Sequence, residues 1–93
     1  MYTNAPLEEI SWLRDIRDTF DKDMGPQRQR ITQYRYQRED VFLIEVCYQC
    51  ADAMTFVYNC AGNMICEFGG IAGVNTCPDF KQNATDKKIL YDN

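Results

Sequence analysis

The sequence contains no histidine, one tryptophan and three prolines among its 93 residues. Without histidine it has no His-based catalytic triad, no HExxH zinc site and no side chain that ordinarily titrates near neutral pH. Long apolar runs are also missing. The longest run, residues 41–44, ends at Glu45, which is too short to cross a bilayer or to form the core of a signal peptide.

Positive charge is scarce as well. Ten lysines and arginines against fourteen aspartates and glutamates give a net charge of −4 and a pI near 4.6. A chain this acidic is a poor candidate for general nucleic-acid binding. Apolar residues make up 45% of the chain, enough for one folded domain over residues 1–93.

Cysteine is abundant, and all five residues lie in the second half of the chain. In so small a domain this density favours an oxidising compartment, where disulfides supplement a thin core. An odd number leaves at least one thiol without a partner in the chain. Connectivity stays open, and a bridge from Cys47 to Cys77 would contribute about 3–4 kcal/mol. We expect an exported protein, and the candidates for structural disulfides are Cys47, Cys50, Cys60, Cys66 and Cys77.

The N-terminal segment predicts an amphipathic helix over about residues 6–22. Asn4 and Pro6 are typical of a helix start, and Gly25-Pro26 is typical of an end. Trp12 flanks the apolar stripe, and we expect it in the core. The stripe recurs at three- and four-residue steps and consists of Leu7, Ile10, Leu13, Ile16 and Phe20.

After the helix the apolar period changes to two, which predicts strands. The connections are short, so consecutive strands form an antiparallel meander. The helix is the one long amphipathic element that can cover such a sheet. We therefore predict an α+β fold in which the N-terminal helix packs on one face of a disulfide-stapled antiparallel meander of about four strands. The strands span about 31–36, 41–48, 54–60 and 64–68, followed by an irregular glycine-rich tail, 69–93, with a possible last strand at 89–91.

The segment Cys47-Tyr48-Gln49-Cys50 is a CxxC motif. In thiol-disulfide enzymes the first cysteine of such a motif lies at a helix N-terminus, where the dipole lowers its pKa. Here the motif ends a predicted strand, so we interpret it as structural. Two alternatives remain: thiol-disulfide exchange, and a four-thiolate metal site in which Cys60 and Cys66, at either end of a hairpin turn, join Cys47 and Cys50.

Three other patterns have simpler structural interpretations. The glycines of residues 69–73 follow a strand as a phosphate loop would, but neither a helix start nor a Walker lysine comes after them, so we expect a bend. Arginines at 28, 30, 35 and 38 interleave with Tyr34 and Tyr36, yet alternation places both tyrosines opposite Arg35, as on a solvated strand. Glu45 and Glu67 suit an acid–base pair only if they meet across the sheet. We assign no catalytic, cofactor-binding or metal-binding residue and no cofactor.

Several segments together resemble small domains in exported lipoproteins of Gram-negative, Bacteroidetes-type bacteria. The most specific part is Tyr58-x-Cys60-x-Gly62-Asn63-x-x-Cys66 followed by Phe68-Gly69-Gly70, and Ser11-Trp12-Leu13, 33–36, 40–44 and Cys77-Pro78-Asp79-Phe80 add to it. The resemblance implies a cell-envelope location and no assigned activity. It also implies membrane attachment only through an N-terminal lipid anchor, which is outside the printed sequence. A looser likeness, over the 58–63 hairpin, is to PepSY-like and β-lactamase-inhibitor-like envelope modules.

From these patterns we expect a non-enzymatic cell-envelope or secreted module that binds a protein or cell-surface ligand and no nucleic acid. The alternative is a thiol-disulfide or Cys-ligated metal module that uses Cys47 and Cys50. The binding surface would be the glycine-rich tail or the sheet face away from the helix. The sheet-face version requires that face to be open, and its residues would be Leu43, Glu45, Cys47, Thr55, Val57 and Asn59.

Overall fold

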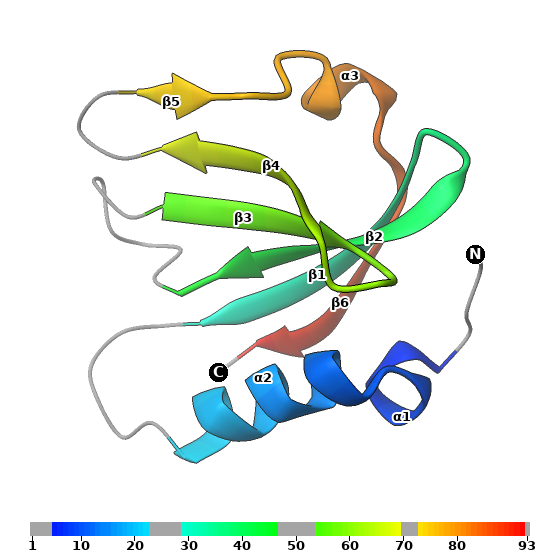
Figure 1. The fold of residues 1–93 in the computed structure, drawn as a ribbon, viewed down its shortest axis with the longest axis vertical. Coiled ribbons are helices and arrows are strands. Elements are labelled where there is room, and N and C mark those ends of the chain that lie inside the picture. The colour runs from blue at the N-terminus through cyan, green and yellow to red at the C-terminus, as the bar shows by residue number, and fades with distance from the viewer. Residues whose placement is uncertain (1–4, 23–28, 47–53, 70–72, 93) are drawn as a thin grey trace.

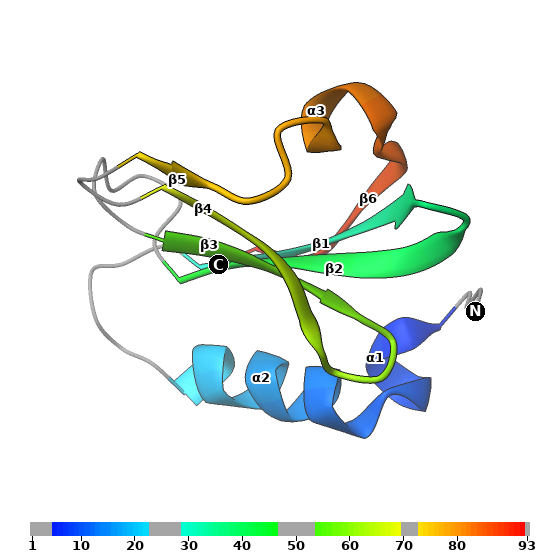
Figure 2. The same cartoon turned by 45° about the horizontal axis from the view of Figure 1, so that its top comes forward.

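The computed structural model describes residues 5–22, 29–46, 54–69 and 73–92. Within these residues, one antiparallel sheet carries helices on both faces (Figures 1 and 2). The helices are α1 (Pro6–Glu9), α2 (Ser11–Lys22) and α3 (Phe80–Asn83). The strands are β1 (Arg30–Tyr36), β2 (Glu39–Glu45), β3 (Met54–Asn59), β4 (Met64–Gly69), β5 (Val74–Asn75) and β6 (Thr85–Asp92).

The predicted α+β class and the antiparallel meander are confirmed, but the number of strands is wrong. The described sheet has six strands in the order β5-β4-β3-β2-β1-β6, not four. The tail predicted to be irregular supplies both additional strands as well as α3. Its last strand, β6, contains the predicted 89–91 segment and returns beside β1. Most of β6 is exposed, and an exposed edge strand lacks the alternation that identifies a half-buried one.

Strand boundaries shift most between β1 and β2. The predicted strands 31–36 and 41–48 leave residues 37–40 as their connection, whereas the turn contains only Gln37 and Arg38, and β2 begins at Glu39. Both turn residues have positive φ, 52° and 67°, as in the type I′ hairpin turn that suits twisted strands. Glycine or asparagine usually marks such a turn, so this one has no sequence signal. β2 ends at Glu45, and the predicted end at 47–48 lies outside the described residues.

The predicted helix over 6–22 is two helices. Ile10 has an extended backbone (φ −107°, ψ 104°) between α1 and α2, although its N–H still bonds Pro6 O and its carbonyl accepts from Arg14 N. The break leaves Ile10 buried, at 5% exposure. Ala5 is the N-cap of α1, with its carbonyl accepting from Glu8 N and Glu9 N, and Asn4 lies outside the described residues.

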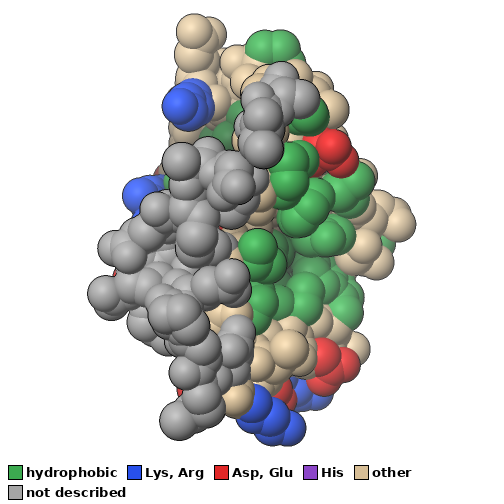
Figure 3. Space-filling model, turned by 90° about the vertical axis from the view of Figure 1, so that its left-hand side faces the viewer, with side chains coloured by type: hydrophobic (Ala, Val, Ile, Leu, Met, Phe, Trp, Pro, Cys, Tyr) green, Lys and Arg blue, Asp and Glu red, His purple; other side chains and the backbone are tan. Residues whose placement is uncertain are grey.

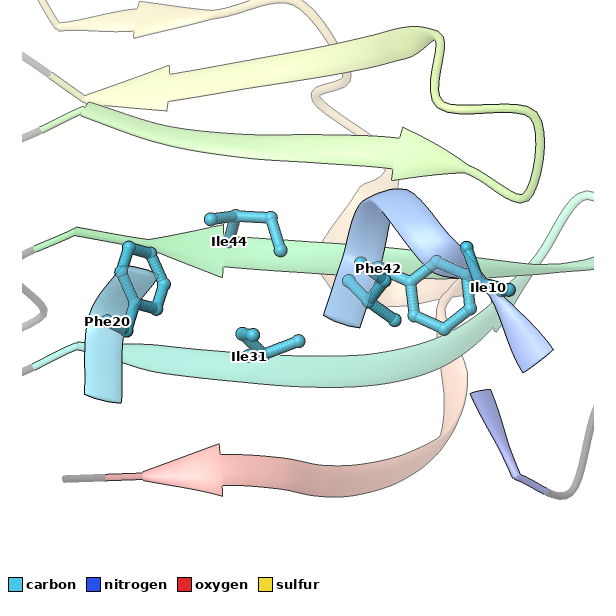
Figure 4. Close-up of a cluster of buried hydrophobic side chains, with 6 residues drawn as sticks. Ile10, Phe20, Ile31, Phe42 and Ile44 are labelled. Carbon is cyan, nitrogen blue, oxygen red and sulfur yellow. The ribbon is translucent and has the colours of Figure 1, made fainter. Parts of the chain in front are cut away.

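The helix-side core is built as the apolar stripe predicts (Figure 4). Side chains from the N-terminal helices meet side chains from β1 and β2 there. Trp12 packs edge-on against Phe42, with 6.0 Å between the ring centroids. Trp12 Nε1 also donates a hydrogen bond to Cys60 O at 3.0 Å, which ties α2 to the β3–β4 hairpin. The predicted place of Trp12 in the core is confirmed. The buried members of this cluster are Ile10, Leu13, Phe20, Ile31, Phe42 and Ile44.

α2 is too short to cover the whole sheet. Its twelve residues extend about 18 Å, and the side chains of Phe56 and Tyr58 in β3, on the same face as Phe42 and Ile44, are only half-buried. Figure 3 shows hydrophobic side chains gathered at the surface beside the grey residues. The helix-side core is therefore partly open along one edge.

Gly62 in the β3–β4 hairpin provides a test of how closely α2 approaches this turn. Its φ is +86°, and a Cβ there would lie 3.4 Å from the Trp12 ring, whereas Gly73 has a φ of +67° with nothing within 4 Å of a Cβ. Left-handed backbone costs an L-residue about 1–2 kcal/mol. We expect Gly73→Ala to cost about 1–2 kcal/mol and Gly62→Ala to cost more, because Trp12 must also move. Urea unfolding measures both, and equal losses would show that the Trp12 contact contributes nothing.

Candidate functional site

The sheet face opposite α2 carries a second apolar cluster, centred on Phe80 of α3. The Phe80 ring lies 5.3 Å from that of Tyr34, 5.0 Å from Tyr36 and 5.5 Å from Phe68, measured between centroids. Tilted and edge-on aromatic pairs at these distances are favourable beyond the area that they bury. Phe80 therefore fixes α3 to the sheet. The buried residues of the cluster are Tyr36, Val41, Val57, Cys66 and Phe80.

The segment of residues 76–83 follows β5 and includes α3. A disulfide between Cys66 and Cys77 holds the start of this segment against β4. Beside it, Thr76 Oγ1 accepts from Glu67 N at 2.9 Å and Thr76 N donates to Glu67 O at 3.1 Å. A bridge of this sequence separation contributes about 3 kcal/mol by the loop-entropy relation. The predicted disulfide staple is confirmed.

This pairing excludes two possibilities that the sequence left open for the cysteines. Cys77 is bonded to Cys66 and not to Cys47. The four-thiolate metal site is wrong for the same reason, since Cys66 has no thiolate to offer. Cys47 and Cys50 lie outside the described residues.

Asp79 anchors the other end of the segment. Tyr36 Oη donates to Asp79 Oδ1 at 2.8 Å, and Asn83 Nδ2 donates to Asp79 Oδ2 at 3.0 Å. Both hydrogen bonds lower the pKa of the Asp79 carboxyl, and the bond from Tyr36 has the larger effect. The pKa of Tyr36 is raised mainly by burial and, to a lesser extent, by its bond to Asp79. The phenol therefore stays protonated and donates throughout the physiological range.

The lowered pKa of Asp79 predicts a pH dependence of the α3 anchor. A carboxyl whose pKa is lower in the folded state stabilises above its unfolded pKa and loses that contribution as pH falls through the folded pKa. The unfolded value is about 4, so we expect amide exchange in α3 to accelerate relative to β2 as the pH is lowered from about 4 to 2. In Asp79→Asn this extra acceleration is absent. Equal acceleration in both proteins would show that Asp79 is not the titrating anchor.

Between this segment and the sheet lies a cleft of about 330 Å³. Its floor comes from the strands and its wall from the chain between β5 and α3, so residues distant in sequence converge on it. The described residues that line it are Tyr34, Leu43, Thr55, Phe68, Asn75, Cys77, Pro78, Phe80 and Lys81.

The cleft corrects the prediction of an open sheet face. Val57, which we expected on that surface, is fully buried in the Phe80 cluster. The sheet face is therefore not the continuous open surface that the sheet-face version of the binding hypothesis requires. Leu43 and Thr55 keep access to the cleft. Asn59 instead uses its side-chain oxygen to accept from Ala61 N and Asn63 N in the hairpin.

The polar groups of the cleft are few and mostly donors. Asn75 Oδ1 already accepts from Cys77 N at 3.0 Å, which leaves its amide NH₂ available. Burial and, to a lesser extent, the nearby Glu45 raise the pKa of Tyr34, so its phenol remains protonated. The described lining residues include one cation, Lys81, and no carboxylate.

The two glutamates considered as an acid–base pair do not meet. Glu45 is opposite Thr55 on the α3 face, whereas Glu67 is opposite Phe56 on the α2 face, with β3 between them. The pKa of Glu45 is raised mainly by burial, against which Arg30 acts to lower it. The structure therefore does not bring the two glutamates together, and the carboxylate that acts on Glu45 is that of Asp92, which also raises its pKa.

The arginine–tyrosine segment alternates as predicted. Tyr34 and Tyr36 point to the Phe80 cluster, whereas Arg35 on the opposite face is 4.0 Å from Asp40 Oδ1 and 3.4 Å from Asp86 Oδ2. Arg30 is 3.6 Å from Asp92 Oδ2. Arg28 lies outside the described residues. These carboxylates offset the positive charge of β1.

The one free cysteine among the described residues is Cys60. Its thiol donates to Asp40 O at 3.5 Å. Its pKa is raised mainly by burial and also by the nearby Asp40.

Gly69 and Gly73 have φ values of +99° and +67°, as expected of a bend after β4. In the described part of the chain we find no group of three or more Cys, Asp or Glu side chains placed to hold a metal, and no helix suited to cross a membrane.

The model of a domain family described as "Domain of unknown function (DUF6970)" matches residues 19–93. The chain belongs to this family. The match includes every strand, α3, the Cys66–Cys77 disulfide and the cleft, but only the end of α2. Neither the curated proteins nor the solved structures contain a match to the chain.

Sequence reasoning missed Phe80 and Lys81 as site residues. Both belong to the tail that we expected to be irregular, and neither is part of a periodic pattern. The available signal was a single large aromatic residue after the Cys77-Pro78-Asp79 run. Such a residue in a polar segment needs an apolar partner elsewhere in the fold.

Proposed function

We propose that this DUF6970 protein is a non-enzymatic envelope or secreted module, and that it binds a partner protein by taking an apolar side chain of that partner into the cleft. The observation that carries the proposal is the cleft itself: about 330 Å³, floored by Leu43 and Phe68 and walled by Phe80. Concave sites with apolar and aromatic linings and a few convergent polar groups are the usual form of binding sites.

The size of the cleft favours one residue of a partner. Ligand pockets range from about 300 to 1,000 Å³, so this one lies at the lower limit and suits a single side chain better than a long lipid tail. Its wall is already fixed by the Cys66–Cys77 disulfide and by the Tyr36–Asp79 hydrogen bond. A preformed wall reduces the ordering cost that association must otherwise meet.

An envelope or secreted location is supported by the cysteine chemistry. Disulfides form and persist in oxidising compartments, and Cys66–Cys77 is such a bond between a buried strand residue and the wall of the cleft. The resemblance to lipoprotein domains of Gram-negative bacteria is consistent with this location. In that case the membrane holds the module only through an N-terminal lipid anchor.

A thiol-based activity of Cys60 has less support. The reactive form of cysteine is the thiolate, and the pKa of Cys60 is raised by burial and by a neighbouring acid. Its Sγ also donates a hydrogen bond to the backbone carbonyl of Asp40. These surroundings disfavour Cys60 as a reactive thiol, whereas the alternative that uses Cys47 and Cys50 lies outside the described residues.

An NMR titration with N-acetyl-phenylalanine amide, a neutral mimic of one aromatic residue, tests the proposal. We expect weak binding, with a Kd of about 1 mM or above, and chemical-shift changes at Leu43, Thr55 and Phe80. Thr55→Arg places a long side chain in the cleft and should abolish these changes. Thr19→Arg, on the exposed surface of α2, is the matched control and should not. Binding that persists in Thr55→Arg, or changes confined to other surfaces, would contradict the proposal.

A further inference from the structure

We infer that the residue entering the cleft is the C-terminal residue of a partner polypeptide, apolar in its side chain, and that Lys81 binds its α-carboxylate. This inference rests on the proposed function and specifies the chemistry of the partner. It is drawn from the charges, hydrogen-bond donors and size of the cleft.

The charge at the cleft is opposite in sign to that of the whole chain. The protein has fourteen acidic residues and a net charge of −4, yet the described lining residues hold a lysine and no acid. Lys81 forms no ion pair with any residue in the described ranges. An unpaired ammonium beside an apolar cleft is complementary to an apolar ligand that carries an anion.

The neighbouring polar groups also favour an acceptor on the ligand. The Asn75 amide offers its NH₂, because its oxygen is bonded to Cys77 N. Thr55 and Tyr34, whose side chains each carry a hydroxyl, line the same cleft. A carboxylate accepts several hydrogen bonds and donates none, so it matches this set better than an amine or an ammonium does.

The nearby acids do not take the place of the ligand's carboxylate. Asp79, two positions before Lys81, has one oxygen bonded to Tyr36 and the other to Asn83. Glu45 does not line the cleft, and Arg30 lies opposite it across β1 and β2. Lys81 is therefore left to act on a ligand.

The size of the cleft indicates which carboxylate is meant. At about 330 Å³ it accommodates about one residue. Once the side chain of that residue fills the apolar floor, the nearest anion is its own α-carboxylate. A chain that ends in an aromatic or aliphatic residue supplies both groups in one unit.

A matched pair of probes tests this directly: N-acetyl-phenylalanine, which carries the carboxylate, and N-acetyl-phenylalanine amide, which does not. An exposed ion pair adds only a small factor to affinity, so we expect the carboxylate to bind about threefold more tightly at low salt. The preference should disappear in about 1 M salt, where the Debye length is about 3 Å. In Lys81→Glu the preference should reverse, whereas Lys22→Glu, at the end of α2 on the opposite face, should leave it intact.

The outcomes separate this inference from the proposed function. If the amide binds at the cleft and the carboxylate binds no better, the inference is wrong and the proposed function stands. If neither probe binds, both fail. A preference that Lys81→Glu leaves unchanged overturns the role of Lys81. Tighter binding of 3-phenylpropionate, which lacks the peptide group, would identify a free apolar acid as the ligand in place of a polypeptide C-terminus.

Discussion

Replacing Phe42 with alanine is expected to lower the free energy of unfolding by about 3–5 kcal/mol. Phe42 is fully buried in β2, within the helix-side cluster, where Trp12 packs against its ring. Its removal leaves a cavity between the sheet and α2 that the surrounding side chains fill only in part. A small domain has about 5–15 kcal/mol of stability in all, so this one substitution removes a large part of it.

Urea unfolding followed by tryptophan fluorescence measures this effect, since Trp12 is the one tryptophan in the chain and lies against Phe42. Met64→Ala is the control, because Met64 is 49% exposed and should change the free energy of unfolding by only about 0.5 kcal/mol. A loss below about 1 kcal/mol in Phe42→Ala would show that the core does not depend on this contact.

Replacing Phe80 with alanine is expected to affect both stability and binding. The ring is 5% exposed and packs against the rings of Tyr34, Tyr36 and Phe68, so its loss should cost up to about 3–5 kcal/mol. It also forms the wall of the cleft. The disulfide keeps Cys77 on β4 in the variant, and we therefore expect α3 to detach while the sheet remains folded, with binding of the phenylalanine probes lost.

Amide exchange at Ala84, whose N–H donates to Phe80 O at 2.8 Å, reports on α3 directly. Its protection should fall sharply in Phe80→Ala and stay unchanged in Gln82→Ala, which alters an exposed side chain of the same helix. Retained protection of Ala84 together with unchanged probe binding would contradict the central place that we give Phe80.

The apolar periodicity was sufficient to predict the helix-side half of the fold. The stripe from Leu7 to Phe20 predicted which helix residues face the core, although Leu7 and Ile16 are only partly buried there. The period of two predicted the strands that this stripe covers. The break at Ile10 was missed because its neighbours retain helical hydrogen bonds and only one residue departs from helical geometry. Local pattern describes how buried the residues are better than it describes backbone angles.

The α3 side of the fold could not be predicted in the same way. β6 is mostly exposed, so its pairing with β1 leaves little trace in its composition. The cleft combines Tyr34 with Phe80 and Lys81, which tertiary contacts alone bring together. The cysteine count predicted a staple but not the Cys66–Cys77 pairing, because sequence does not determine connectivity.

The return of β6 to the side of β1 has a kinetic consequence. Strands β1 to β5 pair with their neighbours along the chain, whereas the β1–β6 pairs join residues between 50 positions (Arg35 and Thr85) and 62 positions (Arg30 and Asp92) apart. Contacts of such long range raise the contact order and slow folding, since chain closure precedes any gain from them. If the meander forms first and β6 docks onto it afterwards, destabilising substitutions in β6 will mainly accelerate unfolding and leave the refolding rate nearly unchanged.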